Sequence, residues 1–376
     1  MKKVKLGEVC EIVTGSTPKS TNPDYWNGEY KWITPAEISD DDFIIVDTQR
    51  KISKLGIEKT GLKSFPIGTV LLSSRAPIGK VAIAGCEMYC NQGFKNFICS
   101  NEINNEYLYY FLKSRKNFLN NIGRGATFKE ISKSIISNIE IILPSYDVQC
   151  TQTQNLKKID NLIYLRKKVI KEYQLLVKSR FNEMFGDFYT TLFPKYKIGE
   201  KFELSSGSTP SRDNKLYWDS GTINWVKTTE VINKEITETE EKITKFALEN
   251  TSLKLFPVNT ILIAMYGQGQ TRGRSAILKV ESTSNQACGA IFPNKIDNPV
   301  FIWHQLMLRY SELRELGRGG NQPNLNGQLI KNFELIFPPL SLQNEFADFV
   351  AQVDKSQFAC QKAIKLWRNS LKSSII

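Results

Sequence analysis

The chain has 376 residues, of which 41% are hydrophobic and 23% charged, so it has a globular composition and is too long for one ordinary core. Its formal net charge of +12 favours a nucleic-acid partner, with a lysine-rich solvated surface as the alternative. Seven cysteines without framework spacing and a single histidine, His304, argue against a disulfide framework and a Cys/His zinc site, and they suit the cytoplasm. No apolar run is long enough to span a bilayer, and Glu8 and Glu11 interrupt any N-terminal signal sequence.

Residues 1–145 form the first predicted domain. They are rich in turns and carry short β-type runs, with an apolar helical stretch late in the segment at 105–122. The β-type runs are at 31–35, 68–74, 80–85, 95–100 and 138–144. This mixture predicts an α+β domain with a compact sheet and a few helices.

Residues 146–186 form a predicted helical spacer. Apolar residues recur there in the heptad pattern of a helix that packs along a partner helix. The polar Arg166 interrupts the pattern, so this helix is not expected to be stable by itself.

Residues 187–340 repeat the first domain. The stretch KLGEVCEIVTGSTP at 5–18 matches KIGEKFELSSGSTP at 197–210, and FPIGTVLLS at 65–73 matches FPVNTILIA at 256–264. The offset between the copies stays between 191 and 194 residues, as expected of two copies that differ in their loops. This period is far above that of solenoid repeats, so each copy is a domain.

Residues 341–376 form the second predicted spacer, and they repeat the heptads of the first at an offset of 194. The economical solution is an antiparallel pair of helices over 147–185 and 341–374, with one domain at each end. The alternative is that each helix packs only on its own domain. The predicted seam consists of Leu156, Ile159, Ile163, Ile170, Tyr173, Val177, Phe346, Val350, Val353, Ile364, Trp367 and Leu371.

Two stretches are similar to catalytic motifs but lack their surroundings. NPDY at 22–25 is similar to the Asn-Pro-Pro-Tyr loop of amino-methyltransferases, and PDYWNGEYK at 23–31 fits a PD…ExK nuclease pattern. The second copy has Leu216 and Thr222 at the places of Asp24 and Glu29, and no glycine-rich adenosylmethionine loop precedes either motif. The only histidine lies in the apolar stretch FIWHQLML, where we expect a packed helical residue. Catalysis by this chain is therefore disfavoured.

Basic and amide side chains recur in glycine-rich loops of both copies, within matching frameworks. Arginine reads guanine and asparagine or glutamine reads adenine through paired hydrogen bonds, while lysine holds phosphates. An ordinary polar turn is the alternative for each loop taken singly, but recurrence at matching positions favours binding. The predicted DNA-contacting residues of the first copy are Lys19, Arg75, Lys80, Arg124, Thr127 and Lys129. Those of the second copy are Arg212, Lys227, Gln268, Gln270, Arg272, Arg274, Arg318, Asn321, Gln322 and Asn324.

The whole pattern resembles the specificity subunit of type I restriction–modification systems. The resemblance rests on the tandem GSTP…YW openings, on the closings RGATFKEIS…NIEIILPSYDVQ and RGGNQPNLNGQLIKNFELIFPPLSLQ, and on LKKIDNLI…LVKSRFNEMFGD between the copies. It implies two tandem α/β target-recognition domains, at 1–145 and 187–340. It also implies two long helices, at 146–186 and 341–376, that form an antiparallel coiled coil with pseudo-two-fold symmetry.

The resemblance further implies a split, asymmetric double-stranded DNA site and no catalysis or cofactor in this chain. Adenine methylation would belong to two adenosylmethionine-dependent modification subunits, and cleavage to restriction subunits. A specificity subunit of a type II system and a single-chain methyltransferase or nuclease remain the alternatives. One departure is that the second helix ends at LKSSII, without a counterpart of RFNEMFGD.

Overall fold

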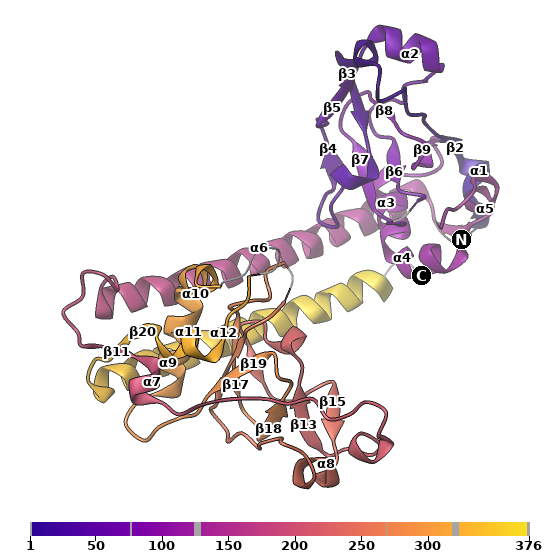
Figure 1. Cartoon of the computed structure of the whole chain (residues 1–376). Coiled ribbons are helices and arrows are strands. Elements are labelled where there is room, and N and C mark those ends of the chain that lie inside the picture. The colour runs from indigo at the N-terminus through magenta and orange to yellow at the C-terminus, as the bar shows by residue number, and fades with distance from the viewer. Residues whose placement is uncertain (1, 76, 124–128, 268, 318–322, 374–376) are drawn as a thin grey trace. The chain divides into compact units, whose positions relative to one another are not determined.

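The chain folds into two units that repeat one order of elements (Figure 1). The computed structural model describes residues 2–75, 77–123, 129–267, 269–317 and 323–373. Unit 1 comprises residues 1–168 and 360–376, and unit 2 comprises residues 169–359. Each unit therefore contains one globular domain together with a segment of each long helix.

Unit 1 is built on a five-stranded sheet, a three-stranded sheet and a two-stranded ladder. The five-stranded sheet has the order β2(Cys10–Val13), β9(Asn96–Cys99), β6(Val70–Leu72), β7(Val81–Ala84) and β4(Ile44–Ile45). The three-stranded sheet has the order β5(Arg50–Ile52), β3(Trp26–Ile33) and β8(Tyr89–Cys90). The ladder pairs β1(Lys2–Lys5) with β10(Glu140–Leu143). These strands confirm the β-type runs predicted from the sequence.

Besides its segments of the two long helices, unit 1 contains several short helices. They are α1(Leu6–Val9), α2(Lys54–Thr60), α3(Asn105–Ser114), α4(Lys116–Ile122) and α5(Lys133–Ser137), with 3₁₀ turns η1(Pro23–Tyr25) and η2(Pro35–Glu37). The stretch 105–122, predicted as one helix, is two helices, because Arg115 at φ −93° and ψ 11° leaves the helical conformation between them. The side chain of Asn104 caps α3 by accepting hydrogen bonds from the next turn, and residues 107–112 are buried.

Unit 2 has the same strand order in each sheet. The five-stranded sheet runs β12(Leu204–Ser206), β19(Cys288–Ile291), β16(Ile261–Ala264), β17(Ser275–Leu278) and β14(Glu235–Ile236). The three-stranded sheet runs β15(Glu241–Ile243), β13(Ile223–Val226) and β18(Ser282–Ser284), and β11(Lys195–Lys197) pairs with β20(Glu334–Ile336). Its short helices are α7(Ile198–Lys201), η3(Lys215–Tyr217), η4(Thr228–Glu230), α8(Lys245–Glu249), α9(Pro299–Leu308), α10(Tyr310–Glu315) and α11(Gly327–Lys331).

The two long helices are α6(Tyr146–Phe185) and α12(Leu340–Ser373). A fully buried glutamine ties the first turn of each to its domain. Gln149 accepts a hydrogen bond from the Asn104 backbone at 2.8 Å, and Gln343 accepts the same bond from Asn298 at 2.8 Å. Both amides also donate to a proline carbonyl five residues earlier. Because these buried amides are fully paired, they fix where each helix begins.

The predicted seam positions are buried or half-buried along both helices. In unit 2, Val177, Phe181 and Phe185 of α6 share one hydrophobic core with Phe346, Val350 and Val353 of α12. In unit 1, Leu156 of α6 belongs to the domain core and Leu371 of α12 packs against that core. The helices therefore pack on each other as well as on the domains. The predicted helix pair is confirmed, and the alternative in which each helix packs only on its own domain is wrong.

Candidate nucleic-acid interface

A pair of tryptophans anchors the GSTP loop in each unit. The rings of Trp26 and Trp32 meet edge to face at 4.9 Å, and those of Trp218 and Trp225 do so at 5.0 Å. Trp32 donates its indole hydrogen to the Ser16 carbonyl at 3.1 Å, and Trp225 donates to Ser208 at 3.0 Å. The GSTP…YW motif is thus a framework that holds the loop in place.

The glycine of each GSTP loop is required by a close approach of two backbones. A Cβ on Gly15 would overlap the carbonyl oxygen of Cys90, and one on Gly207 would overlap that of Ser284. The threonine of each GSTP loop binds a second loop, at 91–92 in unit 1 and at 285–286 in unit 2. Thr17 donates to Gln92 at 2.5 Å, and Thr209 donates to Gln286. The GSTP loop, near which the predicted contacts Lys19 and Arg212 lie, is therefore joined to this second loop in both units.

A guanidinium covers each tryptophan pair, but it comes from a different part of the chain in each unit. In unit 1 it is Arg50 of β5, 3.6 Å from the centre of the Trp26 ring. In unit 2 it is Arg212 of the GSTP loop, 3.8 Å from the centre of the Trp218 ring. The predicted contact residue Arg212 thus also serves as a cation stacked on an aromatic ring.

Arg212 and Lys227 meet at one carboxylate in unit 2. Arg212 pairs with one oxygen of Glu241, and the Lys227 amine lies 3.1 Å from the other oxygen and 2.6 Å from Glu240. The hydrogen bond from Arg212 is the main cause that holds the pKa of Glu241 below its usual value. These two predicted contact residues are therefore charge-paired within the protein.

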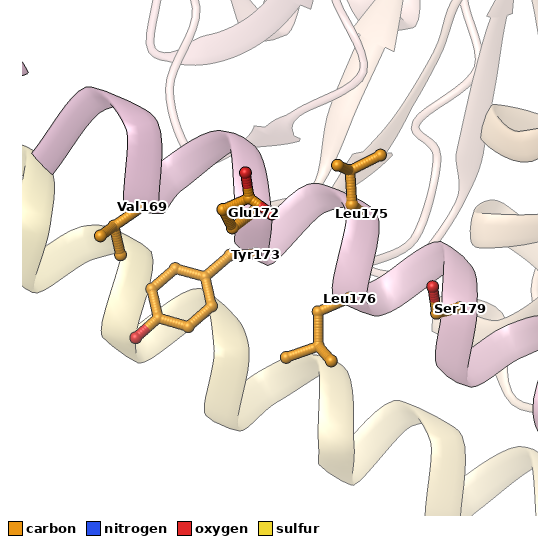
Figure 2. A pocket seen from close by; sticks show the side chains of 6 residues that line it. All are labelled: Val169, Glu172, Tyr173, Leu175, Leu176 and Ser179. Atoms are coloured by element: carbon orange, nitrogen blue, oxygen red, sulfur yellow. The ribbon is translucent and has the colours of Figure 1, made fainter. Parts of the chain in front are cut away.

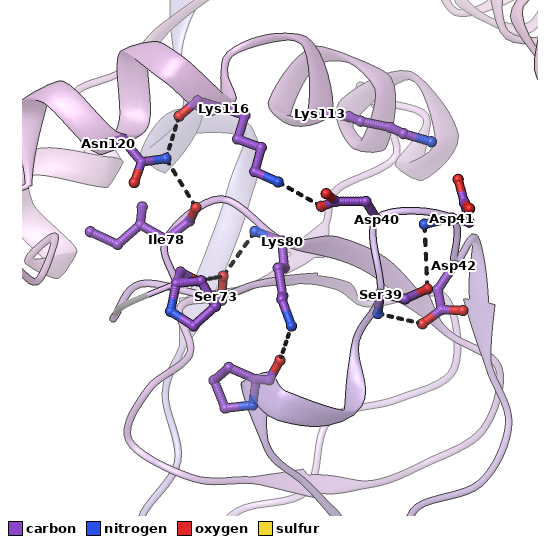
Figure 3. Close-up of polar contacts among 12 residues, drawn as sticks. Ser39, Asp40, Asp41, Asp42, Ser73, Ile78, Lys80, Lys113, Lys116 and Asn120 are labelled. Carbon is purple, nitrogen blue, oxygen red and sulfur yellow. Dashed lines mark hydrogen bonds and ion pairs between the residues drawn. The ribbon is translucent and has the colours of Figure 1, made fainter. Parts of the chain in front are cut away.

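In unit 1, the loop after β6 places Arg75 at the rim of an open pocket of about 640 Å³. Arg75 is exposed, and the pocket is also lined by Pro77, Asn91 and Glu130. Lys80 is half-buried and donates its amine to the Pro35 carbonyl at 3.0 Å (Figure 3). Asn120 of α4 donates to the Ile78 carbonyl at 3.1 Å, which ties the segment just before Lys80 to α4 (Figure 3). Lys19 and Lys129 are exposed.

Two charged residues that the sequence did not single out support Arg75: Glu130, which lines this pocket, and Lys95, which lies behind it. Arg75 donates through Nε to Glu130 at 2.8 Å, and the buried Lys95 reaches the other oxygen of Glu130 at 3.3 Å. The signal available in the sequence was a lysine at the start of a β-type run, since charged residues are almost never fully buried unless they are paired. Its partners lie 35 and 21 residues away, which the run itself does not indicate.

In unit 2, the loop after β16 is held by its own polar side chains. Gln270 accepts a hydrogen bond from Arg274 at 2.8 Å, so the structure brings these two predicted residues together. Arg272 is half-buried and donates to the Pro323 carbonyl, next to the half-buried Asn324. Arg314 donates to the Arg272 carbonyl at 3.0 Å. Arg272 therefore pins this loop to the segment that carries Asn324.

Six of the predicted contact residues lie outside the described part of the chain. They are Arg124, Thr127, Gln268, Arg318, Asn321 and Gln322.

The one histidine is packed in a helix, as the sequence predicts. His304 lies in α9 and its ring contacts those of Trp303 and Phe346, and burial lowers its pKa to about 4. Among the described residues, no group of three or more His, Cys, Asp or Glu side chains is arranged to hold a metal ion. Within the same residues, no helix combines the length and the apolar character that crossing a bilayer requires.

One framework built twice, with different polar side chains at matching loop positions, defines a binding protein with two related recognition surfaces. The family described as "Type I restriction modification DNA specificity domain" matches residues 1–174 and again residues 192–366. The two matches together span most of the chain. The chain belongs to the family of type I restriction–modification specificity subunits.

Individual relatives agree with this assignment. The type I restriction enzyme MjaIX specificity subunit of Methanocaldococcus jannaschii is 28% identical over 382 residues, covering 96% of this chain and 88% of the relative. The S subunit of a type I restriction–modification system from M. genitalium has a TM-score of 0.57 at 16% identity. A second solved structure, from work on complex assembly and conformational transition of the type I R-M system, has a TM-score of 0.66 at 16% identity. Each structure covers 100% of this chain and 96% of its own, and at this identity the likeness concerns the fold.

Proposed function

We propose that the chain reads a split, asymmetric DNA site, with one half-site contacted by each unit. The observation that carries this proposal is the duplication of the framework with a change of side chains at its loops. Arg75 in unit 1 corresponds to Tyr266 in unit 2, and Glu130 corresponds to Asn324, while the strand order around them is the same. Different donors and acceptors on one framework select different bases. The net charge of +12 supplies the attraction for the phosphate backbone.

Residues 1–145 and 187–340 serve in this proposal as the two target-recognition domains, and 146–186 and 341–376 serve as the helical spacers. The predicted contact residues of each copy read the half-site of that copy. The protein works in the cytoplasm, where its DNA lies.

The long helices are the proposed docking sites for two modification subunits. Tyr164 in unit 1 and Phe358 in unit 2 occupy the same position of the two copies, and their exposed fractions are 64% and 68%. Large exposed aromatic side chains are typical of protein interfaces. A repeated anchor on one chain gives two equivalent sites for one kind of partner.

A further apolar patch follows on α6 in unit 2. Val169, Leu175 and Leu176 are exposed and line a shallow groove with Glu172 and Ser179 (Figure 2). The matching positions of the second copy carry Ala363, Asn369 and Ser370, so the sequence does not repeat this patch. The aromatic anchors are therefore the repeated part of the docking surface.

Replacement of each anchor tests this docking. Tyr164→Ala and Phe358→Ala should each leave one modification subunit bound in place of two, and the double variant should bind none. Native mass spectrometry of the reconstituted complex counts the subunits. Tyr189→Ala, which removes another exposed aromatic of unit 2, is the control and should keep both. Two bound subunits in the double variant would refute the docking sites.

Methylation and cleavage belong, in this proposal, to the modification and restriction subunits, and adenosylmethionine binds to the modification subunits. The purified chain incubated with DNA, adenosylmethionine and Mg²⁺ should therefore show no turnover, and methylation should appear when the modification subunits are added. Turnover by the chain alone would favour a single-chain enzyme.

Selection of bound duplexes from a randomised library tests the recognition itself. The full-length chain, assembled with its modification subunits, should enrich two short constant blocks separated by an unspecified gap of constant length. Enrichment of a single continuous block, or no enrichment over the starting library, would overturn the proposal.

A further inference from the structure

Three charged side chains of unit 1 form a chain of contacts that ends at Arg75. The Lys95 amine lies 3.4 Å from the Ser74 hydroxyl and 3.3 Å from one oxygen of Glu130. The other oxygen of Glu130 accepts the Arg75 Nε hydrogen at 2.8 Å. Arg75 and Glu130 also face each other in an isolated antiparallel bridge, so their backbones are fixed as well. The carboxylate is therefore held from both sides, and it holds the arginine.

The three charges run from the interior to the surface. The side chain of Lys95 is 9% exposed and that of Arg75 is 44% exposed. Burial raises the pKa of Glu130, but the hydrogen bonds from Arg75 and Lys95 outweigh it and keep the pKa below its usual value. The carboxylate is thus ionised at neutral pH. Because two cations share this one carboxylate, a net positive charge remains at the pocket that Arg75 lines.

The bond to Glu130 decides which edge of the Arg75 guanidinium is available. Glu130 takes Nε, and among the described residues neither Nη1 nor Nη2 of Arg75 has a hydrogen-bond partner. The outer edge therefore presents two parallel donors. Guanine offers two acceptors, O6 and N7, in the major groove, whereas adenine places an amino donor where guanine has O6. A guanidinium fixed in this way accepts guanine and rejects adenine.

Unit 2 carries no charge at the same four framework positions. The Ile131 backbone donates to the Ser74 carbonyl at 2.9 Å, and the equivalent bond from Leu325 to Met265 is 3.0 Å. Around these matched bonds, unit 1 has Ser74, Arg75, Lys95 and Glu130, and unit 2 has Met265, Tyr266, Gly289 and Asn324. The buried lysine and its carboxylate are therefore a property of one unit and its specificity, because the framework forms equally without them.

We propose that Arg75 reads a guanine in the half-site of unit 1 and that Lys95 and Glu130 are positioning residues that fix its guanidinium for this contact. This inference rests on the proposed reading of DNA by both units. It adds the identity of one base and two residues that act through Arg75.

The test is selection from the randomised duplex library by the full-length chain with its modification subunits. Arg75→Ala should lower the preference for guanine at one position of one half-site about five- to a hundredfold, the range expected for one bidentate base contact. Glu130→Gln and Lys95→Met should lower the preference at that same position about three- to tenfold, as expected for loss of orientation alone. The double variant Arg75→Ala/Glu130→Gln should match Arg75→Ala, because both changes act on one contact.

Lys3→Met is the control, because it also removes one carboxylate-paired lysine from unit 1, where Lys3 pairs with Glu140 at 2.5 Å. It should change no base preference. Glu130→Gln removes the charge but keeps the shape of a half-exposed side chain, so the variant should lose the orientation of Arg75 without losing its fold. Thermal melting of each variant checks the fold.

The outcomes separate the inference from the proposed function. A wild-type complex that enriches no sequence overturns both. A selective wild type with an unchanged preference in Arg75→Ala overturns the guanine contact alone. If Glu130→Gln and Lys95→Met leave every base preference unchanged, as Lys3→Met does, the positioning role is overturned. It is also overturned if these variants change the half-site read by unit 2.

Discussion

Arg166 donates through Nη1 to the sulfur of Cys360 at 3.4 Å, and these two residues occupy the same position of the two copies, 194 residues apart. Elsewhere along the helices, Phe181 meets Phe346 with ring centres 5.4 Å apart. Residue numbers therefore fall along α12 as they rise along α6, so the paired helices run antiparallel. When two equivalent helices pair antiparallel, equivalent residues meet only at the middle of the pair. The contact between Arg166 and Cys360 marks that middle level.

The helix pair can be lengthened symmetrically at the point where Arg166 meets Cys360. Seven residues inserted after Arg166 and seven after Cys360 keep the seam in phase and add about 10 Å. We expect the complex to keep both half-site sequences while the unspecified gap grows by about three base pairs. A longer gap also rotates one half-site relative to the other about the DNA axis, which weakens binding. The preferred gap is therefore measured by selection from duplexes that cover a range of gap lengths.

The matched control inserts seven residues into α6 only. That change puts the two rows of seam residues out of register, so it should destabilise the protein and give no new gap. An unchanged preferred gap in a folded, active double insertion would mean that the helices do not set the spacing.

Two phenylalanines of α12 should differ sharply in their effect on stability. Phe346 is fully buried and its ring lies 5.4 Å from that of Phe181, whereas Phe358 is 68% exposed. Phe346→Ala should cost about 3–5 kcal/mol of unfolding free energy. Phe358→Ala should change it by less than about 0.5 kcal/mol. Urea denaturation measures both, and similar losses would contradict the packing of the seam.

The single histidine gives the stability a pH dependence of known sign. Burial lowers the pKa of His304 from 6.5 to about 4, so below pH 6.5 the unfolded chain takes up a proton that the folded chain does not. Stability from this group is therefore lost as the pH falls from about 6.5 towards 4. His304→Gln removes this titration, so between pH 7 and pH 5 the variant should lose about 2 kcal/mol less than the wild type. Parallel stability curves for the two proteins would contradict the buried neutral histidine.

Specificity changes in unit 2 should stay within one half-site. Asn324→Ala removes an amide that can pair with an adenine edge, so it should cost about 1–3 kcal/mol of discrimination at one base pair. The half-site read by unit 1 should be unaffected. Asn250→Ala, which changes an amide at the end of α8, is the matched control and should alter neither half-site. A change in both half-sites after Asn324→Ala would contradict independent reading.

The architecture could be predicted from the sequence because it is encoded by periodic patterns. The repeat predicts two units with one strand order, and the heptads predict the buried faces of α6 and α12. The break at Arg115 was missed, because an apolar pattern continues through 105–122 while the backbone conformation changes at a single residue.

The recognition surface was less predictable, because it depends on pairs that are distant in the sequence. Arg75 is identified by its loop, but its partner Glu130 lies 55 residues away, and the buried Lys95 lies just before β9. Arg212 was expected to contact DNA, and no sequence pattern indicated that it covers Trp218 and pairs with Glu241. Such contacts follow from the tertiary fold, which brings separate loops to one place.

The most direct test of the account is to compare the methylated sites of the host genome with and without this gene. Deletion should abolish methylation at one split motif, with two constant half-sites and a gap of constant length, and the intact gene should restore it. An unchanged set of methylated sites, or the loss of an undivided motif, would contradict a chain that reads two half-sites with two units.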